Sequence, residues 1–376
     1  MTQTVAALRL VGTAPIDPAT TPPTGNLAMQ DVVIPDPGPG EVLVEPLFAG
    51  VCGSDNSASL GKPNFAWVQR PRTLGHEFSA RIVGFGKGAE GHAGMKVGDV
   101  VCGLAMRGCQ DPRCRGCRRG KWNYCRRRRI IGFHRDGALA TRAILEVDRC
   151  IPLQPGITPL QAALVEPLSV VAQGVLRKCG IQPGQDVVVS GCGIMGLMAA
   201  ELAREAGARV AITGIERDRE VRLALAQRRG FVPIVVTPEA PLHERLRQGV
   251  EALDGTRFGD GFEDGLVDVL IECSGAPQAL STAGLAVQPE GTICTIATYP
   301  CDVAFGATAF TRSGQSMQGV MGSSHEDYDN AQRLLQRGVL PVEDYTQVYA
   351  FENAMTAMAD SIAARTPKAI LRLQSA

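Results

Sequence analysis

A short glycine motif between a strand and a helix constrains this chain more than any other feature. Residues 191–196 read Gly-Cys-Gly-Ile-Met-Gly and fit the pattern G-x-G-x-x-G. The apolar run 186–190 before them is typical of a buried strand, and residues 195–206 predict a helix. In this context the glycines allow a tight turn, a close approach of the backbone to a pyrophosphate, and close packing of helix on strand. The motif therefore predicts a dinucleotide-binding loop. The residues expected to hold the cofactor are Gly191, Gly193, Ile194, Met195 and Gly196.

Strands and helices alternate through the region that follows this loop. A helix is expected over 217–229 and further strands over 209–213, 232–236, 268–272 and 291–296. This alternation predicts an α/β fold, a doubly wound parallel sheet of the Rossmann type with helices on both faces.

The part of the chain before the glycine motif has a different sequence pattern. Residues 1 to about 165 hold short β-type runs separated by turn residues, which predicts a small, mostly β domain. After about residue 323 a helix over 327–337 is followed by mixed segments that end in 368–373.

The residue that contacts the cofactor ribose is open to two readings. An acidic residue is normally found about 20 residues after the loop, at the end of the second strand. The count favours Glu216, whereas the strand end itself is Gly214. A glycine there, with Arg217 and Arg219 close behind, would leave room and charge for a 2′-phosphate. The alternative is that both arginines solvate the first turn of a helix, so NAD and NADP both stay open.

Length and charge narrow the class of protein. With 376 residues, two domains are expected. Lysine plus arginine equals aspartate plus glutamate, so no overall field recruits nucleic acid or a membrane. A secretory signal and a membrane-length apolar run are not expected, which favours a soluble cytoplasmic protein. Twelve cysteines in such a chain favour metal binding over disulfides.

Four of those cysteines lie close together, spaced C-x4-C-x2-C-x7-C. They are Cys109, Cys114, Cys117 and Cys125. Four thiolates at such spacings close a tetrahedron around a structural zinc ion. The surrounding arginines are read as a solvated face that offsets the charge of the tetrathiolate, in preference to a nucleic-acid or anionic-substrate patch. The seven scattered cysteines are expected to be buried apolar residues: Cys102, Cys150, Cys179, Cys192, Cys273, Cys294 and Cys301.

Two segments near the N-terminus predict a second, catalytic zinc site. They are Cys52-Gly53-Ser54-Asp55 and Gly75-His76-Glu77. A thiolate, an imidazole and a carboxylate form a mixed ligand set, and a catalytic zinc ion keeps one position open.

With these features together, the chain resembles the zinc-dependent medium-chain dehydrogenase/reductase family, in its polyol, sugar and threonine dehydrogenase branch. The resemblance runs almost end to end. It rests on Val51-Cys52-Gly53-Ser54-Asp55, Leu74-Gly75-His76-Glu77, Val97-Gly98-Asp99-Val100-Val101, Val165-Glu166-Pro167-Leu168-Ser169 and Glu272-Cys273-Ser274-Gly275. It implies a GroES-like catalytic domain over 1–172 with a zinc lobe at 107–130, a Rossmann domain over 173–323, and a segment 324–376 that completes the catalytic domain.

The resemblance also implies roles for single residues. Cys52 and His76 match zinc ligands, and Glu166 matches the third protein ligand of this branch. Glu77 matches a carboxylate beside the metal. Ser54 matches the hydroxyl that takes the substrate proton, and Asp55 the acid that orients His76. For Glu166 the alternative is an exposed carboxylate at a helix start.

Two departures from the family pattern stand out. Many relatives carry a histidine where this chain has Ser57, so the proton exit is expected to run through water. The lobe usually opens with C-x2-C, whereas Cys109 and Cys114 here enclose four residues. His134 is read either as a substrate contact or as a surface-loop histidine.

These features together predict zinc-assisted hydride transfer between a secondary alcohol (a polyol, sugar, cyclitol or related hydroxyl) and NAD or NADP. The expected partners are a small alcohol or carbonyl substrate and further copies of the chain, as a homodimer or homotetramer, without nucleic acid or membrane. Two rivals are a zinc-free quinone or enoyl reductase, and a binding or regulatory protein that uses the arginine-rich zinc lobe without dehydrogenase activity.

Overall fold

The computed structural model describes residues 2–17, 19–20, 25–251, 255–258 and 266–374. The chain divides into two compact units, Met1–Ser169 with Gly322–Ala376 (unit 1) and Val170–Met321 (unit 2). The boundaries expected from the sequence, after residues 172 and 323, differ from these by a few residues.

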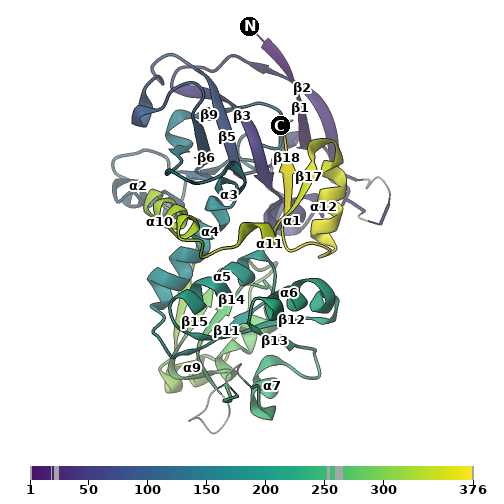
Figure 1. Ribbon diagram of the computed structural model, residues 1–376, viewed down its shortest axis with the longest axis vertical. Helices are drawn as coiled ribbons and strands as arrows, with labels where there is room; N and C mark the ends of the chain where they lie inside the picture. The colour runs from purple at the N-terminus through teal and green to yellow at the C-terminus, as the bar shows by residue number, and fades with distance from the viewer. Residues whose placement is uncertain (1, 18, 21–24, 252–254, 259–265, 375–376) are drawn as a thin grey trace. The chain divides into compact units, whose positions relative to one another are not determined.

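Unit 2 is built on a parallel six-stranded sheet with the order β13-β12-β11-β14-β15-β16 (Figure 1). The first strand of this unit, β11, lies in the middle of the sheet and the strand order reverses beside it, as in a Rossmann sheet. Buried aliphatic side chains such as Val188, Leu270 and Ile293 form its core. The strands are β11 (Asp186–Ser190), β12 (Arg209–Gly214), β13 (Val232–Val235), β14 (Val267–Glu272), β15 (Val287–Thr295) and β16 (Ser316–Gly319).

The described helices of unit 2 connect these strands. They are α5 (Ile194–Glu205), α6 (Ala224–Arg228), α7 (Leu242–Gln248), α8 (Pro277–Ser281) and α9 (Ala307–Ser313). The single helix expected over 217–229 is divided. A 3₁₀ turn at Glu216–Asp218 and a π-helical turn at Arg219–Leu223 precede α6. The Asp218 carboxylate accepts the Ile215 N–H at 3.1 Å, which fixes the tight first turn.

Unit 1 is mostly β structure. Its main sheet has the order β10-β6-β5-β3-β18-β17, with β9 also paired to β3, and a smaller sheet has the order β2-β1-β4. The strands are β1 (Thr2–Leu10), β2 (Leu27–Pro35), β3 (Glu41–Gly50), β4 (Arg72–Thr73), β5 (Glu77–Phe85), β6 (Val100–Gly103), β7 (Met106–Arg107), β8 (Arg129–Ile130), β9 (Ala143–Glu146), β10 (Cys150–Pro152), β17 (Gln347–Ala350) and β18 (Ala369–Arg372).

The C-terminal segment completes this unit. In Figure 1 the yellow β18 lies beside the purple β3, and the two strands pair antiparallel, with Ile370 opposite Gly50. Met358 and Leu371 are buried in one core with Val44 and Phe78. The helices are α1 (Gly53–Ser59), α2 (Arg115–Arg118), α3 (Pro159–Ala162), α4 (Val165–Ala172, which runs across the unit boundary), α10 (His325–Gln336), α11 (Val342–Tyr345) and α12 (Ala354–Ile362).

The burial of the scattered cysteines differs from expectation at the C-terminal end of unit 2. Cys102, Cys150, Cys192 and Cys294 are buried, while Cys179 and Cys273 are half-buried. Cys301 is exposed, so the prediction that it is buried is wrong. It lies in an irregular loop after β15, where no periodic strand or helix buries one face. No helix among the described residues has the length and apolar character needed to cross a membrane.

Candidate active site

The backbone brings the two N-terminal motifs together at one end of the main sheet of unit 1. Cys52 is the N-cap residue of α1, directly after β3, and His76 directly precedes β5. Because β3 and β5 pair with Gly50 opposite Glu77, the two motifs lie side by side. Gly75 has φ +96°, and a Cβ there would lie 2.8 Å from the Leu139 nitrogen, so only glycine fits before His76.

The cluster formed by these motifs has the composition of a zinc site. The Cys52 thiol, a ring nitrogen of His76 and a carboxylate oxygen of Glu77 all lie within 4.8 Å of one another. His76 and Glu77 are buried and Cys52 is half-buried. Sulfur, nitrogen and oxygen donors at this spacing suit a tetrahedral zinc ion.

Asp55 and Ser54 surround the imidazole of His76. Asp55 is fully buried, and its Oδ2 accepts the Cys52 N–H at 3.1 Å. Its Oδ1 lies 3.8 Å from His76 Nδ1, and neither atom has a hydrogen-bond partner among the described residues. The Ser54 hydroxyl lies 3.5 Å from His76 Nε2. These positions suit a carboxylate that orients a metal-binding histidine through Nδ1, leaving Nε2 for the metal.

Glu166 lies in the same buried environment but outside the tight cluster. It stands in the first turn of α4 and is only 8% exposed, so the alternative of an exposed carboxylate is wrong. Burial raises the pKa of Glu166 to about 7, and the charge on His76 opposes the rise. Its carboxylate is not among the three donors that lie within 4.8 Å of one another.

Lys368 is the residue of this site that the sequence analysis missed. It directly precedes β18, is only 3% exposed, and its Nζ donates to the Val51 carbonyl at 2.9 Å. The ammonium also forms an ion pair with Glu77. Gly50 makes room for this pair, since a Cβ there would lie 2.4 Å from Glu77 Oε2. The only signal in the sequence is a lone lysine at the start of an apolar strand, 291 residues from its partner.

We expect Lys368→Met to lower the free energy of unfolding by about 3–5 kcal/mol, because it leaves the Glu77 carboxylate buried without its counter-charge. Urea unfolding at neutral pH measures this effect. The double variant Glu77→Gln/Lys368→Met should recover part of the loss. The control is Lys121→Met, which breaks a pair with the exposed Glu326 and should cost less than about 1 kcal/mol. Equal losses in the two lysine variants would contradict a special role for the buried pair.

The charge balance of the cluster favours a bound dication. Burial raises the pKa of the Cys52 thiol, and the charge on Glu77 adds to the rise. Burial likewise raises the pKa of Asp55. Burial lowers the pKa of His76, but the charges of Cys52 and Asp55 outweigh it and hold the pKa well above its usual value. One lysine faces a thiol and three buried carboxyls here, so a divalent metal would offset the remaining negative charge.

The four-cysteine lobe forms a second donor cluster in unit 1. The sulfur atoms of Cys109, Cys114, Cys117 and Cys125 all lie within 4.8 Å of one another. The pairs Cys109–Cys117 and Cys114–Cys125 are each 3.8 Å apart. A tetrahedron with Zn–S bonds of about 2.3 Å has edges of about 3.8 Å, so the lobe has the dimensions of a zinc tetrathiolate. The Cys109 N–H donates to the Cys125 sulfur at 3.4 Å, which is typical support for a metal thiolate.

In unit 2 the glycine loop has the geometry of a phosphate cradle. Gly191 follows β11 with φ +99°, and α5 begins at Ile194 with Gly193 as its N-cap. A Cβ on Gly196 would lie 1.8 Å from the Gly191 carbonyl oxygen, so this glycine is required for packing. A Cβ on Gly193 would meet nothing, which leaves an open approach to the helix N-terminus, where Met195 stands in the first turn. The loop therefore fits a dinucleotide pyrophosphate.

At the end of β12 the surroundings of Gly214 exclude a larger residue. A Cβ there would lie 2.7 Å from the Cys192 sulfur and 3.0 Å from Leu223. Glu216 is 71% exposed and forms a bidentate ion pair with Arg219, with distances of 2.7 and 2.8 Å. Arg217 is exposed.

Aromatic rings extend from His76 within unit 1. The His76 and Phe133 ring centroids are 5.4 Å apart, and Trp67 lies 4.6 Å from His134 and 6.2 Å from Phe133. Burial lowers the pKa of His134, and the charges of nearby arginines lower it further. Its Nδ1 accepts the Ile130 N–H at 3.2 Å, so the neutral ring carries its proton on Nε2.

Comparison with known proteins places these sites in a family. Residues 38–155 match the alcohol dehydrogenase GroES-like domain, and residues 195–337 match the zinc-binding dehydrogenase domain. The chain is 30% identical over 311 residues to the L-galactonate-5-dehydrogenase of Escherichia coli K12, covering 82% of this chain and 84% of the relative. The chain belongs to the zinc-dependent medium-chain dehydrogenase family. This confirms the resemblance and the expected combination of a GroES-like and a Rossmann domain.

Other relatives of this dehydrogenase agree. This chain is 35% identical to the sorbitol dehydrogenase of Halalkalibacterium halodurans over 68% of each chain. It is 30% identical to the L-threonine 3-dehydrogenase of Pyrococcus horikoshii over 86% of this chain and 88% of that one. A solved zinc-binding dehydrogenase of Sinorhizobium meliloti 1021, bound to NADP, aligns over 98% of this chain and 99% of its own with a TM-score of 0.80 and 25% identity.

The protein is therefore an NAD(P)-dependent zinc oxidoreductase of the alcohol and polyol dehydrogenase class. Zinc and a nicotinamide dinucleotide are its cofactors. The comparisons give no support to a binding or regulatory protein without dehydrogenase activity.

Proposed function

We propose that this dehydrogenase oxidises a secondary hydroxyl of a polyol, sugar or sugar acid, or reduces the matching ketone. The observation that carries the proposal is the buried cluster of Cys52, His76 and Glu77 in unit 1. The substrates named for its relatives, galactonate, sorbitol and threonine, all carry a secondary hydroxyl beside other polar groups.

In this proposal Cys52 and His76 hold the catalytic zinc, with Glu166 as the third protein ligand and Glu77 held beside it by Lys368. Bound zinc supplies a Lewis acid that lowers the pKa of the substrate hydroxyl and stabilises the developing charge. Asp55 orients His76, and its own position is fixed by the Cys52 N–H. Lys368 holds the Glu77 carboxylate in place through a buried ion pair.

Ser54 is proposed to accept the hydroxyl proton. Its Oγ stands next to the Nε2 side of His76, where a ligand hydroxyl would lie. Ser57, half-buried on the same helix α1, stands where many relatives carry a histidine, and we propose that Ser54 passes its own proton directly to water as it accepts that of the substrate. Gly191, Gly193 and Gly196 would hold the dinucleotide, whose nicotinamide would supply the hydride acceptor.

The aromatic rings next to His76 support a polyhydroxylated substrate. Trp67 is 48% exposed, and its indole N–H is used by the Asn64 carbonyl at 2.9 Å, so the ring offers an apolar surface. The neutral His134, whose ring is tilted against the Trp67 ring, carries an Nε2–H, which can donate to a substrate hydroxyl. An apolar wall with a few polar groups is typical of small-molecule sites.

The test is a set of initial rates for NAD⁺ and NADP⁺ reduction with polyols, aldonates, sugars, cyclitols, threonine and simple secondary alcohols. We expect the highest kcat/KM with a polyol, sugar or sugar acid, and lower values with simple alcohols that lack the extra hydroxyls. A clear preference for a simple alcohol would contradict the proposed substrate class.

We further propose a preference for NADP. The residue at the end of β12, where a ribose-binding acid usually stands, is Gly214, and its surroundings leave no room for an acidic side chain. The nearby Glu216 is already paired with Arg219. Arg217 is exposed beside this position. We expect Arg217→Ala to lower kcat/KM for NADP⁺ by about tenfold and to leave that for NAD⁺ unchanged, since one charge-assisted contact to the 2′-phosphate is lost. Arg228→Ala, an exposed arginine at the end of α6, is the control. Equal losses with both cofactors would contradict the assignment.

We also propose a cytoplasmic homo-oligomer. None of the twelve cysteines, which all lie in the described ranges, forms a disulfide bond, which supports a reducing compartment. Strand β16 is at the end of the sheet order of unit 2, and Leu285 and Phe305 are exposed apolar residues that line a groove of about 240 Å³ beside it. An open edge with apolar neighbours suits pairing with a second copy. Light scattering after gel filtration should give the mass of a dimer or tetramer, and a monomer at micromolar concentration would contradict this.

A further inference from the structure

The charges of this chain are unevenly distributed although its net charge is zero. The lobe formed by residues 107–130 holds ten of the 38 lysines and arginines and only one of the 38 acidic residues, Asp111. The lobe therefore carries nine excess positive charges and the rest of the chain nine excess negative ones. Such an excess within 24 residues creates a strong local field for anions.

The structural zinc site does not account for this excess. One zinc ion with four thiolates carries a net charge of about −2, so it offsets only a small part of the lobe's cations. The one acidic residue of the lobe, Asp111, is paired with Arg113 and Arg127 at 3.3 and 2.8 Å, so it neutralises none of the other cations. Hydrogen bonds from these arginines hold the pKa of Asp111 low, at about 2.

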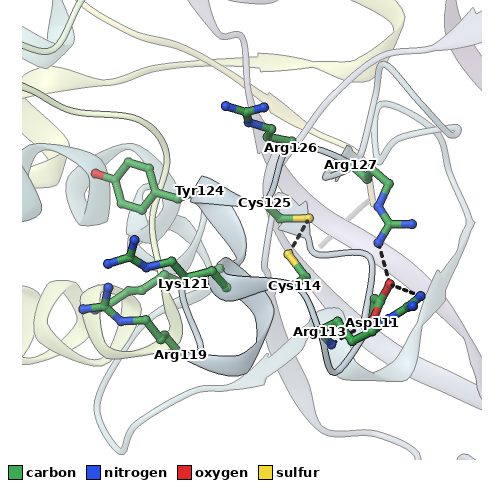
Figure 2. A pocket seen from close by; sticks show the side chains of 11 residues that line it. Asp111, Arg113, Cys114, Arg119, Lys121, Tyr124, Cys125, Arg126 and Arg127 are labelled. Carbon is green, nitrogen blue, oxygen red and sulfur yellow. Dashed lines mark hydrogen bonds and ion pairs between the residues drawn. The ribbon is translucent and has the colours of Figure 1, made fainter.

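Six of the lobe's ten cations line a hollow. A pocket of about 830 Å³ lies on the lobe, within the size range of small-molecule sites. Figure 2 shows Arg119, Lys121 and Tyr124 on one side of it, Arg113, Asp111 and Arg127 on the other, and the sulfurs of Cys114 and Cys125 between them. The lining residues are Asp111, Arg113, Cys114, Arg115, Gly116, Arg119, Lys121, Tyr124, Cys125, Arg126 and Arg127.

Three of these arginines have no ion-pair partner in the part of the chain that the structure describes. Arg115, Arg119 and Arg126 are exposed and form no ion pair with a described carboxylate, while Lys121 contacts only the exposed Glu326 at 3.4 Å. Guanidinium groups that line a hollow and form no ion pair of their own are suited to phosphate oxygens, which they bind in a bidentate manner. The Tyr124 ring, 45% exposed at the rim, adds a flat surface on which a base can stack.

We propose that this pocket is a second anion site of the protein, separate from the dinucleotide loop of unit 2, and that it binds a nucleoside polyphosphate. The adjacent phosphates contact Arg115, Arg119 and Arg126, and the base stacks on Tyr124. The concave shape favours a small ligand over a long polyanion, because an extended nucleic acid needs a groove along its backbone and not a single hollow. The proposed contacts use none of the residues proposed for the catalytic zinc site or for the dinucleotide loop, so the proposal stands independently of the proposed function.

The test is isothermal titration of ATP into the zinc-loaded enzyme, with the Rossmann site saturated by the preferred dinucleotide and the zinc content measured before and after. We expect ATP to bind, adenosine to show no binding, and inorganic tripolyphosphate to bind more weakly than ATP. The variant Arg119→Ala/Arg126→Ala should weaken ATP by about tenfold or more. Tyr124→Ala should weaken ATP but not tripolyphosphate.

The matched control is Arg118→Ala/Arg129→Ala, which removes two exposed charges from the same lobe that do not line the pocket. ATP affinity should change little in this variant. The same loss in both pairs would overturn the proposal in favour of diffuse attraction, and the absence of ATP binding to the unmodified enzyme would overturn it outright. Tighter binding of a single-stranded oligonucleotide than of ATP, with a steep salt dependence, would replace the nucleotide by nucleic acid.

Discussion

Alcohol oxidation should fall by roughly a thousandfold or more in His76→Ala, while the variant still binds the dinucleotide. The imidazole is one of only three donors in the tight cluster of unit 1, so its loss opens the proposed zinc site. A Lewis acid supplies several kcal/mol of transition-state stabilisation, and 1.4 kcal/mol corresponds to about tenfold in rate. The glycine loop lies in unit 2 and keeps its own structure.

Two measurements test this result: steady-state rates with the preferred alcohol, and fluorescence titration with NADPH and NADH. Cys52→Ser should give the same pattern, because a hydroxyl is a poor zinc ligand compared with a thiolate. His92→Ala is the control, since His92 is exposed in a short 3₁₀ turn of the same unit and the variant should keep full activity. Near-normal turnover in His76→Ala or Cys52→Ser would contradict the assignment of the zinc ligands.

Cys117→Ser should lower stability by several kcal/mol and remove the metal of the lobe, with little direct effect on the chemistry. Four sulfurs at tetrahedral distances close the site, and the binding free energy of a structural zinc ion contributes directly to folding. The lobe otherwise depends on short elements, α2 and the two-residue strands β7 and β8, which cannot hold it alone.

Thermal melting together with metal analysis measures the effect of Cys117→Ser. Cys301→Ser is the matched control, because it makes the same chemical change at an exposed cysteine outside the donor clusters. An unchanged melting curve in Cys117→Ser, or an equal shift in both variants, would argue against a structural zinc ion in the lobe.

Local patterns in the sequence predicted much of this fold. The strand at 186–190, the glycine loop and the helix after it form as expected, because they depend on neighbours in the chain. The division of the helix expected over 217–229 was not predictable, since it depends on how the Asp218 side chain binds the backbone of Ile215. Apolar periodicity does not report such a local competition.

The site was harder to predict from the sequence than the fold, for a similar reason. Cys52, His76 and Glu77 lie in recognisable motifs, so the cluster they form could be proposed from the sequence. The contact between Glu77 and Lys368 joins residues from opposite ends of the chain and depends on the pairing of β3 with β18. The position of Glu166, buried but outside the tight cluster, likewise depends on tertiary packing. A single sequence contains no local signal for the Glu77–Lys368 contact or for the position of Glu166.

The discontinuity of unit 1 has a consequence for synthesis of the chain on the ribosome. The whole of unit 2 leaves the ribosome before α10, α12, β17 and β18 have been made. During that interval residues 48–50 of β3 pair only with β5 and lack β18 on their other side, and Glu77 lacks its counter-charge. Domains generally fold as units as they emerge. The dinucleotide-binding unit can therefore fold first, and the catalytic unit is completed last.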